Sequence, residues 1–521
     1  MKIVIVSIFL ILTITHILHA LHVFQQNRYE LDRYTKWLLD LKNLRPNGYF
    51  TYVALAFIAE YLFVHFLVAI DGLAIIIVTA LTAIVLLYRE EHKTYIKPLV
   101  YTDRVKRQII CISILDIILV SLLVFSDTDL LIIACLLPLT SWLLIYPMAI
   151  ITRPLEEKIK KGYENEARDI LAKSPELIKV AITGSYGKTS TKNVLYHILD
   201  EKYYTLMTPA SYNTPMGITR TIREEMKPIH ELFLCEMGAD HKGDITYLMD
   251  FVKPSIGILT SIGPQHLNTF GSLDNIIKEK FEVIERLPSD GLGIINIDNE
   301  LIRDHKIEND VRIVTVGIDS EADYRAYDVH FDNKGSSFKV MIDDEEYEFE
   351  TVLLGKHNIT NLLLGIALGH KLGIETSKII DAIRELRPIA HRLETREING
   401  YHFIDNAFNS NPVSSRLSLD VLAMMPQKRV IVTPGLIDLG KDEERYNEEF
   451  GAYMKDRADH VILVGKGRAR AILKGLERSG FDMSEVDIVD DIYNAFDHIY
   501  QNFTKDDTIL LENDLPDAFS N

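Results

Sequence analysis

The sequence predicts an α/β protein in which an N-terminal helical transmembrane region is followed by a central and a C-terminal α/β domain. Three observations lead to this prediction. Long apolar runs are confined to the first 152 residues, strand-like runs alternate with helical patterns from Ile178 to Ile297, and further strand-like runs lie between Arg429 and Leu511. Such alternation is typical of parallel βαβ units. A chain of 521 residues is long enough for three or four domains.

The N-terminal region contains five apolar stretches of a length that could cross a bilayer. They are Ile3–Ala20, Tyr52–Ile70, Leu73–Tyr88, Ile109–Phe125 and Leu130–Ile151. Lysine and arginine gather after the first, third and fifth stretches, whereas the two other connections contain acidic residues. By the positive-inside rule, the N-terminus faces out and the chain after Ile151 lies in the cytoplasm. We therefore expect a multi-pass protein of the cell membrane.

Charge and cysteine usage narrow the class of protein. The net charge is −18, and the acidic excess lies after the N-terminal region. This argues against nucleic acid as a partner, because nucleic-acid phosphates call for basic surfaces. Cys111, Cys135 and Cys235 show neither a disulfide framework nor the spacing of a cysteine zinc site, which fits a reducing cytoplasm.

Composition and pattern divide the chain into four parts. These are a transmembrane region at 1–152, a charged helical linker at 153–174, a central α/β domain at 175–387 and a C-terminal α/β domain at 388–521. Alternating polar and apolar residues at 325–350 predict a small antiparallel insertion in the central domain.

The strongest local signal is a glycine-rich turn between a predicted strand and a predicted helix. It reads Thr183, Gly184, Ser185, Tyr186, Gly187, Lys188, Thr189 and Ser190. Glycines let backbone N–H groups approach phosphate oxygens, and the helix N-terminus adds a partial positive charge. Lys188 would contact the terminal phosphates of a nucleotide, and the Thr189 hydroxyl would bind Mg²⁺. A glycine turn that only begins a helix is the alternative, because Ile182 stands where the general motif has its first glycine.

Two further residues follow predicted strands. Glu236 ends the apolar run Leu232–Cys235, and His266 lies in the turn after the run Ile256–Thr260. A carboxylate at the carboxyl end of a sheet strand suits a metal site, and a histidine there could bind Mg²⁺ or move a proton. The alternatives are a solvated acid and a structural or surface histidine.

These motifs resemble the Mur ligase family, most closely the branch that adds D-alanyl-D-alanine to the muramyl tripeptide, over residues from about Ile178 to about Leu439. The shortened phosphate loop of that family, T-G-x-x-G-K-[ST]-[ST], is matched by Thr183–Ser190, which accounts for Ile182. The E-M-G-A stretch is matched by Glu236–Ala239 and the G-x-H-N-x-x-N motif by Gly355–Asn361.

The resemblance implies a role for each matching residue. Glu236 and His266 would hold Mg²⁺, and Lys280 would be the carbamylated lysine that binds a second Mg²⁺. Asn296 would lie near the nucleotide and Asn358 near adenine. Arg392 would reach the nucleotide when the C-terminal domain closes, and Asp405 would hold the ribose.

The chain also departs from the family pattern. Asn406 replaces an acid, Phe408 replaces a tyrosine, and Thr433–Gly435 replaces the usual G-D-M stretch. The N-terminal domain that grips the UDP-sugar in the family has no counterpart here, and the apolar stretches stand in its place. The resemblance therefore suggests a membrane-anchored variant.

The implied reaction is ATP-dependent amide formation, with ATP and Mg²⁺ as cofactors. An acceptor carboxylate would be phosphorylated, and an amine would then displace the phosphate. The expected partners are a small-molecule or lipid-linked cell-wall precursor, an amino acid or dipeptide, and membrane lipids, without nucleic acid. Two alternatives stay open: a ligase that glutamylates a folate or polymer, and a membrane transporter or sensor that uses the α/β part as an ATP-driven module.

Overall fold

The computed structural model describes most of the chain. The described residues are 2–39, 98–125, 140–265, 267–332, 335–389, 391–407, 412–437, 439, 442–465 and 467–512. They form two compact units that divide between residues 162 and 163, and each unit is described below by itself.

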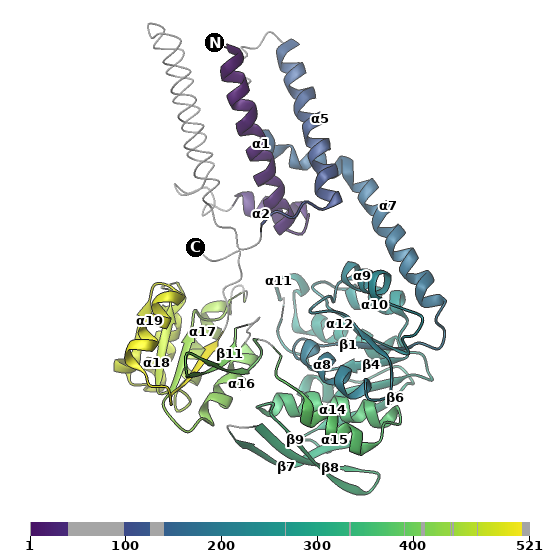
Figure 1. Cartoon of the computed structure of the whole chain (residues 1–521), viewed down its shortest axis with the longest axis vertical. Helices are drawn as coiled ribbons and strands as arrows, with labels where there is room; N and C mark the ends of the chain where they lie inside the picture. Colours follow the sequence, from purple (N-terminus) through teal and green to yellow (C-terminus); the bar gives the residue numbers. More distant parts are fainter. Residues whose placement is uncertain are drawn as a thin grey trace. The chain divides into compact units, whose positions relative to one another are not determined.

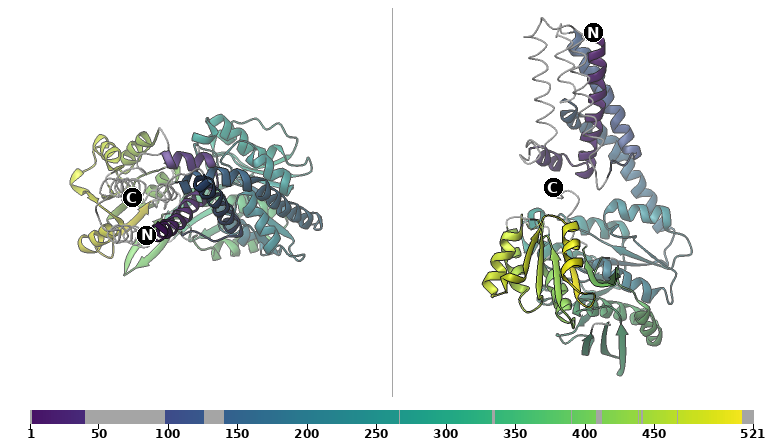
Figure 2. Two further views of the ribbon diagram at one scale, coloured as in Figure 1. Left: turned by 90° about the horizontal axis from the view of Figure 1, so that it is seen from above. Right: turned by 60° about the vertical axis from the view of Figure 1, so that its left-hand side comes forward.

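The N-terminal unit is helical (Figure 1). Its helices are α1 (Lys2–Gln26), α2 (Leu31–Leu39), α5 (Asp103–Phe125) and the first part of α7 (Ile145–Ala172). Figure 2 shows α1 and α5 side by side. Phe24, Tyr34, Ile112 and Trp142 form part of one buried cluster between these helices. The Tyr34 hydroxyl donates to the Trp142 carbonyl at 3.0 Å, so the cluster also satisfies a buried polar group.

The prediction of a transmembrane region, and with it a multi-pass location in the cell membrane, is wrong for the residues that the structure describes. No helix among them is both long enough and apolar enough to cross a bilayer. Hydropathy alone does not reveal what covers an apolar side chain, and here Ile17, Leu21, Ile112 and Met148 are buried against one another. The described residues give no support to the expectation of membrane lipids as partners.

Part of that prediction falls on residues outside the described ranges. The stretches Tyr52–Ile70 and Leu73–Tyr88 lie wholly outside them, and Leu130–Ile151 is described only from residue 140 onwards.

The second unit begins with a nine-stranded sheet in the order β2-β3-β1-β4-β5-β6-β7-β8-β9. Its strands are β1 (Ile178–Thr183), β2 (Thr205–Met207), β3 (Leu232–Glu236), β4 (Ile256–Leu259), β5 (Leu292–Asn296), β6 (Arg312–Gly317), β7 (Tyr324–Asp332), β8 (Gly335–Ile342) and β9 (Glu345–Thr351). The pairs from β2 to β7 are parallel, which confirms the predicted βαβ pattern. Strands β7, β8 and β9 pair antiparallel, as predicted for 325–350, and they extend the main sheet.

Helices cover both faces of this sheet. They are α8 (Lys188–Leu199), α9 (Pro215–Glu225), α10 (Asp244–Val252), α11 (Leu267–Phe270), α12 (Leu273–Glu285), α13 (Glu300–Arg303), α14 (Lys356–Lys371) and α15 (Thr376–Glu385). One face carries α8, α14 and α15, which lie together in Figure 1. Helices α9, α10 and α12 pack in a second buried cluster. Because both faces are covered, the inner strands are continuous apolar runs, as sequence reasoning assumed.

A six-stranded sheet follows, in the order β10-β11-β15-β12-β13-β14. Its strands are β10 (Glu394–Ile398), β11 (Tyr401–Asn406), β12 (Arg429–Thr433), β13 (His460–Val464), β14 (Val486–Val489) and β15 (Thr508–Glu512). Its helices are α16 (Pro412–Ala423), α17 (Glu443–Tyr453), α18 (Ala469–Ser479), the 3₁₀ helix η2 (Met483–Glu485) and α19 (Ile492–Asn502). All pairs except β10–β11 are parallel (Figure 2). The predicted domain boundaries at 153, 175 and 388 stay predictions.

Candidate nucleotide and metal site

The glycine-rich turn follows β1 directly and leads into α8. Gly184 has φ +152° and Gly187, the N-cap of α8, has φ +82°. A Cβ atom on Gly184 would lie 2.1 Å from Thr260 Oγ1 and 2.9 Å from the Ser261 carbonyl oxygen. The turn therefore needs glycine at 184 for lack of space and at 187 for backbone conformation.

A second turn, after β4, holds this first turn in place. The Ser185 amide donates to the Ser261 carbonyl at 2.7 Å, and the Ser185 hydroxyl donates to the Gly263 carbonyl at 3.0 Å. The Tyr186 hydroxyl donates to the Pro264 carbonyl at 2.6 Å. The loop is thus fixed by its own and neighbouring backbone, which leaves the start of α8 preorganised for an anion.

Lys188 folds back over the loop. Its Nζ atom donates to the Gly184 carbonyl at 2.7 Å and to the Ser185 carbonyl at 3.1 Å. Burial lowers the pKa of Lys188, and the Arg392 charge acts in the same direction, while Glu236 opposes both. A phosphate group would offer this ammonium a full negative charge in place of two carbonyl dipoles.

Glu236, at the carboxyl end of β3, contacts three other side chains of the site through its carboxylate. Its Oε1 atom accepts from Thr189 Oγ1 at 3.2 Å and from Asn213 Nδ2 at 3.0 Å. Its Oε2 atom lies 3.0 Å from Lys192 Nζ, and both side chains of this ion pair are only 1% exposed. The structure therefore brings Thr189 and Glu236 together, as a shared metal site would require.

Sequence reasoning missed Lys192. The available signal was its position four residues after Lys188, which places both lysines on the same face of α8. In the fold, that face points toward the end of β3. Lys192 is the directly paired counter-charge of the buried Glu236 carboxylate.

Lys280 lies on α12, and 1% of it is exposed. Burial is the main cause that lowers its pKa to about 7, with a further contribution from the Lys188 charge. The neighbouring Glu279 is engaged elsewhere, because its two oxygens accept from the amides of Gly243 and Ile245 at 2.7 Å each. Lys280 is thus a buried amine that is substantially neutral near pH 7.

The two asparagines expected near the nucleotide hold the backbone of the site. Asn296 donates from Nδ2 to the Thr260 carbonyl at 3.0 Å and accepts from the Asp298 amide at 3.1 Å. Asn358 donates to the Leu354 carbonyl at 2.8 Å, at the start of α14. Direct contact of either amide with a nucleotide stays a prediction.

Two predicted residues come from the second sheet and the segment before it. Arg392 precedes β10. Burial lowers the pKa of Arg392, and the nearby Glu236 carboxylate opposes this effect in part. Asp405, on β11, accepts from His391 Nδ1 at 2.7 Å and from the Ala407 amide at 3.1 Å. Ser190 lies in the first turn of α8, and His266 lies outside the described residues.

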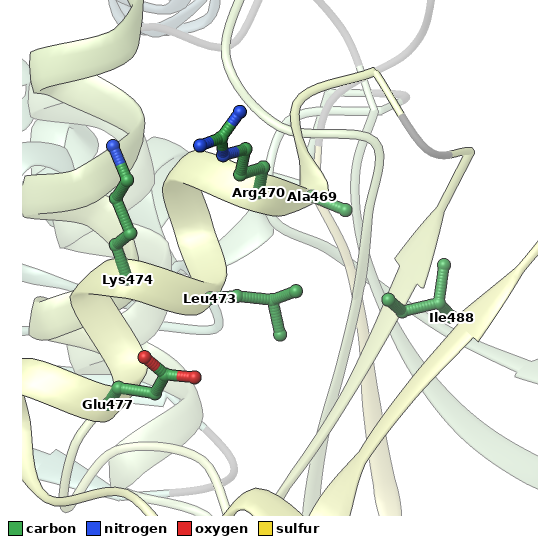
Figure 3. A pocket seen from close by; sticks show the side chains of 6 residues that line it. All are labelled: Ala469, Arg470, Leu473, Lys474, Glu477 and Ile488. Carbon is green, nitrogen blue, oxygen red and sulfur yellow. The ribbon is translucent and has the colours of Figure 1, made fainter.

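A cavity of about 380 Å³ lies elsewhere, between α18 and β14 (Figure 3). It is lined by Ala469, Arg470, Leu473, Lys474, Glu477 and Ile488. None of the residues predicted for the site lines it, so it gives no support to the nucleotide assignment.

Asn406, which departs from the family pattern, has a partner far away in the sequence. Its Nδ2 atom donates to Glu512 Oε2 at 2.9 Å, and the Ser418 hydroxyl donates to the same oxygen. Asn406 and Glu512 are 5% and 1% exposed. The amide therefore satisfies a buried carboxylate that an acid at position 406 would repel.

Asn406→Asp is expected to lower the free energy of unfolding by about 3 kcal/mol at pH 7, because two buried carboxylates would then face each other. The loss should shrink as the pH falls, since the raised pKa of the pair lets one carboxyl accept a proton. Urea denaturation at pH 7 and pH 5.5 measures both effects. Asn399→Asp, at an exposed position, is the control, and an equal loss in both variants would contradict the argument.

Comparisons with known proteins agree with this arrangement. The family model of the Mur ligase middle domain matches residues 182–369, and the model described as "Mur ligase, glutamate ligase domain" matches residues 391–512. Together the two matches cover more than half of the chain.

Similar proteins point the same way. The UDP-N-acetylmuramoyl-tripeptide–D-alanyl-D-alanine ligase of Bacillus subtilis is 28% identical over 64% of this chain and 72% of its own length. The enzyme of the same name from Escherichia coli is 28% identical over 55% of this chain, which spans 64% of that relative, slightly under two thirds.

Solved structures share the fold. MurF from Acinetobacter baumannii aligns with a TM-score of 0.62 at 23% identity, over 68% of this chain and 77% of that one. MurF from Thermotoga maritima, solved in complex with ADP, aligns with a TM-score of 0.61 at 22% identity, over 68% and 80%. With its middle and C-terminal domains both matched, the chain belongs to the Mur ligase family of ATP-dependent ligases.

Proposed function

We propose that this protein is the Mur ligase that joins D-alanyl-D-alanine to the peptide of a peptidoglycan precursor, at the expense of ATP. The observation that carries the proposal is the convergence of Lys188, Thr189 and Glu236 at the carboxyl ends of β1 and β3. The names of the relatives from Bacillus subtilis and Escherichia coli supply the substrate pair. Within the chain, we assign ATP binding to residues 175–387 and the closing domain to residues 388–521.

The phosphate loop would bind the β- and γ-phosphates of ATP through the backbone N–H groups at the N-terminus of α8, from Gly187 onwards. On binding, Lys188 Nζ would leave the carbonyls of Gly184 and Ser185 and neutralise phosphate charge. Phosphoryl transfer needs positioning and charge neutralisation rather than a protein nucleophile. The fixed loop and the Lys188 ammonium meet these two needs.

The residues beside the loop suit Mg²⁺. The Thr189 hydroxyl and the Glu236 carboxylate lie 3.2 Å apart and offer oxygen ligands, as Mg²⁺ prefers. Carbamylation would turn Lys280 from a nitrogen base into an oxygen ligand for a second Mg²⁺, and His266 would join Glu236 at the first. Bound there, the ion would neutralise the charge that develops on the transferred phosphoryl group.

The reaction has two steps. A carboxylate oxygen of the acceptor attacks the γ-phosphorus, ADP leaves, and an acyl phosphate forms. The amine of the dipeptide then attacks the acyl carbon, phosphate leaves, and an amide forms with loss of one proton from nitrogen. Arg392 and Asp405 would close over the nucleotide and exclude water, which would otherwise hydrolyse the acyl phosphate.

The test is an assay with purified protein, Mg²⁺-ATP, UDP-N-acetylmuramoyl-tripeptide and D-alanyl-D-alanine. Phosphate release should require both substrates, and mass spectrometry should find one amide product for each ADP formed. Parallel reactions contain a lipid-linked precursor as acceptor, or glutamate with a folate. Amide formation only in the glutamate reaction, or ATP hydrolysis without any amide, would overturn the proposal.

A further inference from the structure

A second cluster of ligating side chains lies in the C-terminal sheet, outside the site described above. His460 begins β13, Asp487 lies on the adjacent strand β14, and His498 lies on α19. Asp487 Oδ2 lies 2.8 Å from His460 Nε2 and 3.0 Å from His498 Nε2. One carboxylate oxygen is therefore placed between two imidazole nitrogens that come from different elements.

We propose that His460, Asp487 and His498 form a binding site for Zn²⁺. Two imidazole nitrogens and a carboxylate oxygen are ligands that Zn²⁺ prefers. The three ligand atoms lie within 4.8 Å of one another. Tetrahedral zinc with bonds of about 2.0–2.1 Å needs ligand atoms about 3.3 Å apart. Asp487 Oδ2 would therefore move a few tenths of an ångström away from each histidine nitrogen, and the two nitrogens, now within 4.8 Å of each other, would settle at that separation.

A further carboxylate orients the first histidine for this role. His460 Nδ1 lies 2.8 Å from Glu485 Oε2, which leaves Nε2 facing Asp487. Metal-binding histidines commonly donate their second ring nitrogen to a carboxylate in this manner. Lys428 Nζ donates to the same Glu485 oxygen at 2.9 Å.

A second group of side chains, His391, Glu394 and Asp405, also brings ligand atoms together. It is a poorer candidate for a metal site, because Arg396 lies 3.2 Å from Glu394 and 3.6 Å from Asp405 and its charge would repel a cation. Among the described residues, the ion-pair partners of Asp487 are the two histidines.

Accessibility and hydrogen-bond capacity are also compatible with an ion. The side chains of His460, Asp487 and His498 are 9%, 42% and 25% exposed, so an ion can enter and keep a water as its fourth ligand. Asp487 Oδ2 already faces one nitrogen of each histidine. Zinc held by these three atoms would tie β13, β14 and α19 together.

The experiment measures zinc binding to the full chain after chelation and dialysis, by competition with a chromophoric chelator at pH 7.5. We expect the wild-type protein to bind one more Zn²⁺ ion than His498→Ala, with an affinity for that ion at least tenfold above any residual affinity in the variant. Asp487→Asn keeps the size of the side chain but removes its charge, and it should lose the same ion.

His402→Ala is the matched control, because His402 is an exposed histidine on β11 of the same sheet. Zinc should raise the melting temperature of the wild type and of His402→Ala, but not that of His498→Ala. Equal zinc stoichiometry and affinity in the wild type and His498→Ala, or no zinc bound by the wild type, would overturn the proposal. None of these measurements uses ligase activity, so the result is independent of the proposed function.

Discussion

Lys188→Ala is expected to reduce ATP turnover by about a thousandfold, the loss typical of removing a charged group that stabilises a transition state. In the structure, the Lys188 ammonium contacts the loop that would receive the phosphates, and in the variant nothing replaces its charge. Steady-state release of ADP, with the proposed substrates present, measures the effect. Circular dichroism and the melting temperature should stay close to those of the wild type.

Lys202→Ala is the control that separates the loss of a charge at the phosphate loop from the loss of lysine–carbonyl hydrogen bonds. Lys202 Nζ also donates to two backbone carbonyls, those of Leu372 and Gly373, at 2.9 and 3.0 Å, but it lies beyond the far end of α8 from the phosphate loop. Both variants lose two lysine–carbonyl hydrogen bonds. Only Lys188→Ala should lose turnover, and turnover within tenfold of the wild type in that variant would refute the assignment of the loop.

Removal of carbon dioxide is expected to lower activity by about a hundredfold, and bicarbonate should restore it. The reason is the buried amine of Lys280, whose pKa of about 7 leaves it half neutral at pH 7. A neutral amine attacks carbon dioxide, a nitrogen–carbon bond forms, and the nitrogen loses a proton to give a carbamate anion. The carbamate would replace repulsion between Lys280 and Lys188 by attraction and would supply metal-binding oxygens.

The pH dependence of this effect follows from the direction of the pKa shift. A lowered lysine pKa means that the protonated form, which cannot react with carbon dioxide, dominates below pH 7. The neutral fraction rises from about a tenth at pH 6 to about nine tenths at pH 8. Activity at a fixed, subsaturating concentration of dissolved carbon dioxide should therefore increase over this interval, while an unshifted lysine would stay protonated throughout.

Two variants control the carbon dioxide experiment. Lys280→Ala should be as inactive as the depleted wild type and should not respond to bicarbonate. Lys278→Ala removes an exposed lysine from the same helix and should behave as the wild type. Labelled bicarbonate should give a carbamate carbon signal in the wild type that Lys280→Ala lacks. A wild type that keeps full activity without carbon dioxide would exclude the carbamate.

Much of the site could be read from the sequence because its parts are local. The strand Ile178–Thr183, the glycine turn and Lys188 form one continuous segment, and steric limits on the backbone dictate its shape. Glu236 could be named because it ends an apolar strand, and the carboxyl ends of parallel strands meet at one edge.

Other features escaped prediction because they depend on pairing between distant segments. The contact of Asn406 with Glu512 joins residues that the parallel pairing of β11 with β15 places opposite each other. The ion pair of Lys192 with Glu236 depends on which face of α8 packs against β3. The low pKa of Lys280 depends on the atoms that bury its side chain.

The prediction of membrane helices failed for a related reason. Hydropathy measures how strongly a side chain avoids water. It does not distinguish a side chain that is buried in lipid from one that is buried against a neighbouring helix. In the described part of the N-terminal unit, Phe24, Ile112 and Trp142 are covered by other side chains of the unit. Ile117, Leu122 and Phe125 of α5 are exposed.

The order of residues along the chain was thus enough to predict the alternation of strands and helices, the glycine-rich turn between β1 and α8, and the family. These follow from backbone sterics and from hydrophobic periodicity, which act over a few residues. The tertiary structure decided which charges face one another: Lys192 against Glu236, Asn406 against Glu512, and two histidines against Asp487. Electrostatic interactions and burial depend on distance in space, and strand order, not sequence separation, sets that distance.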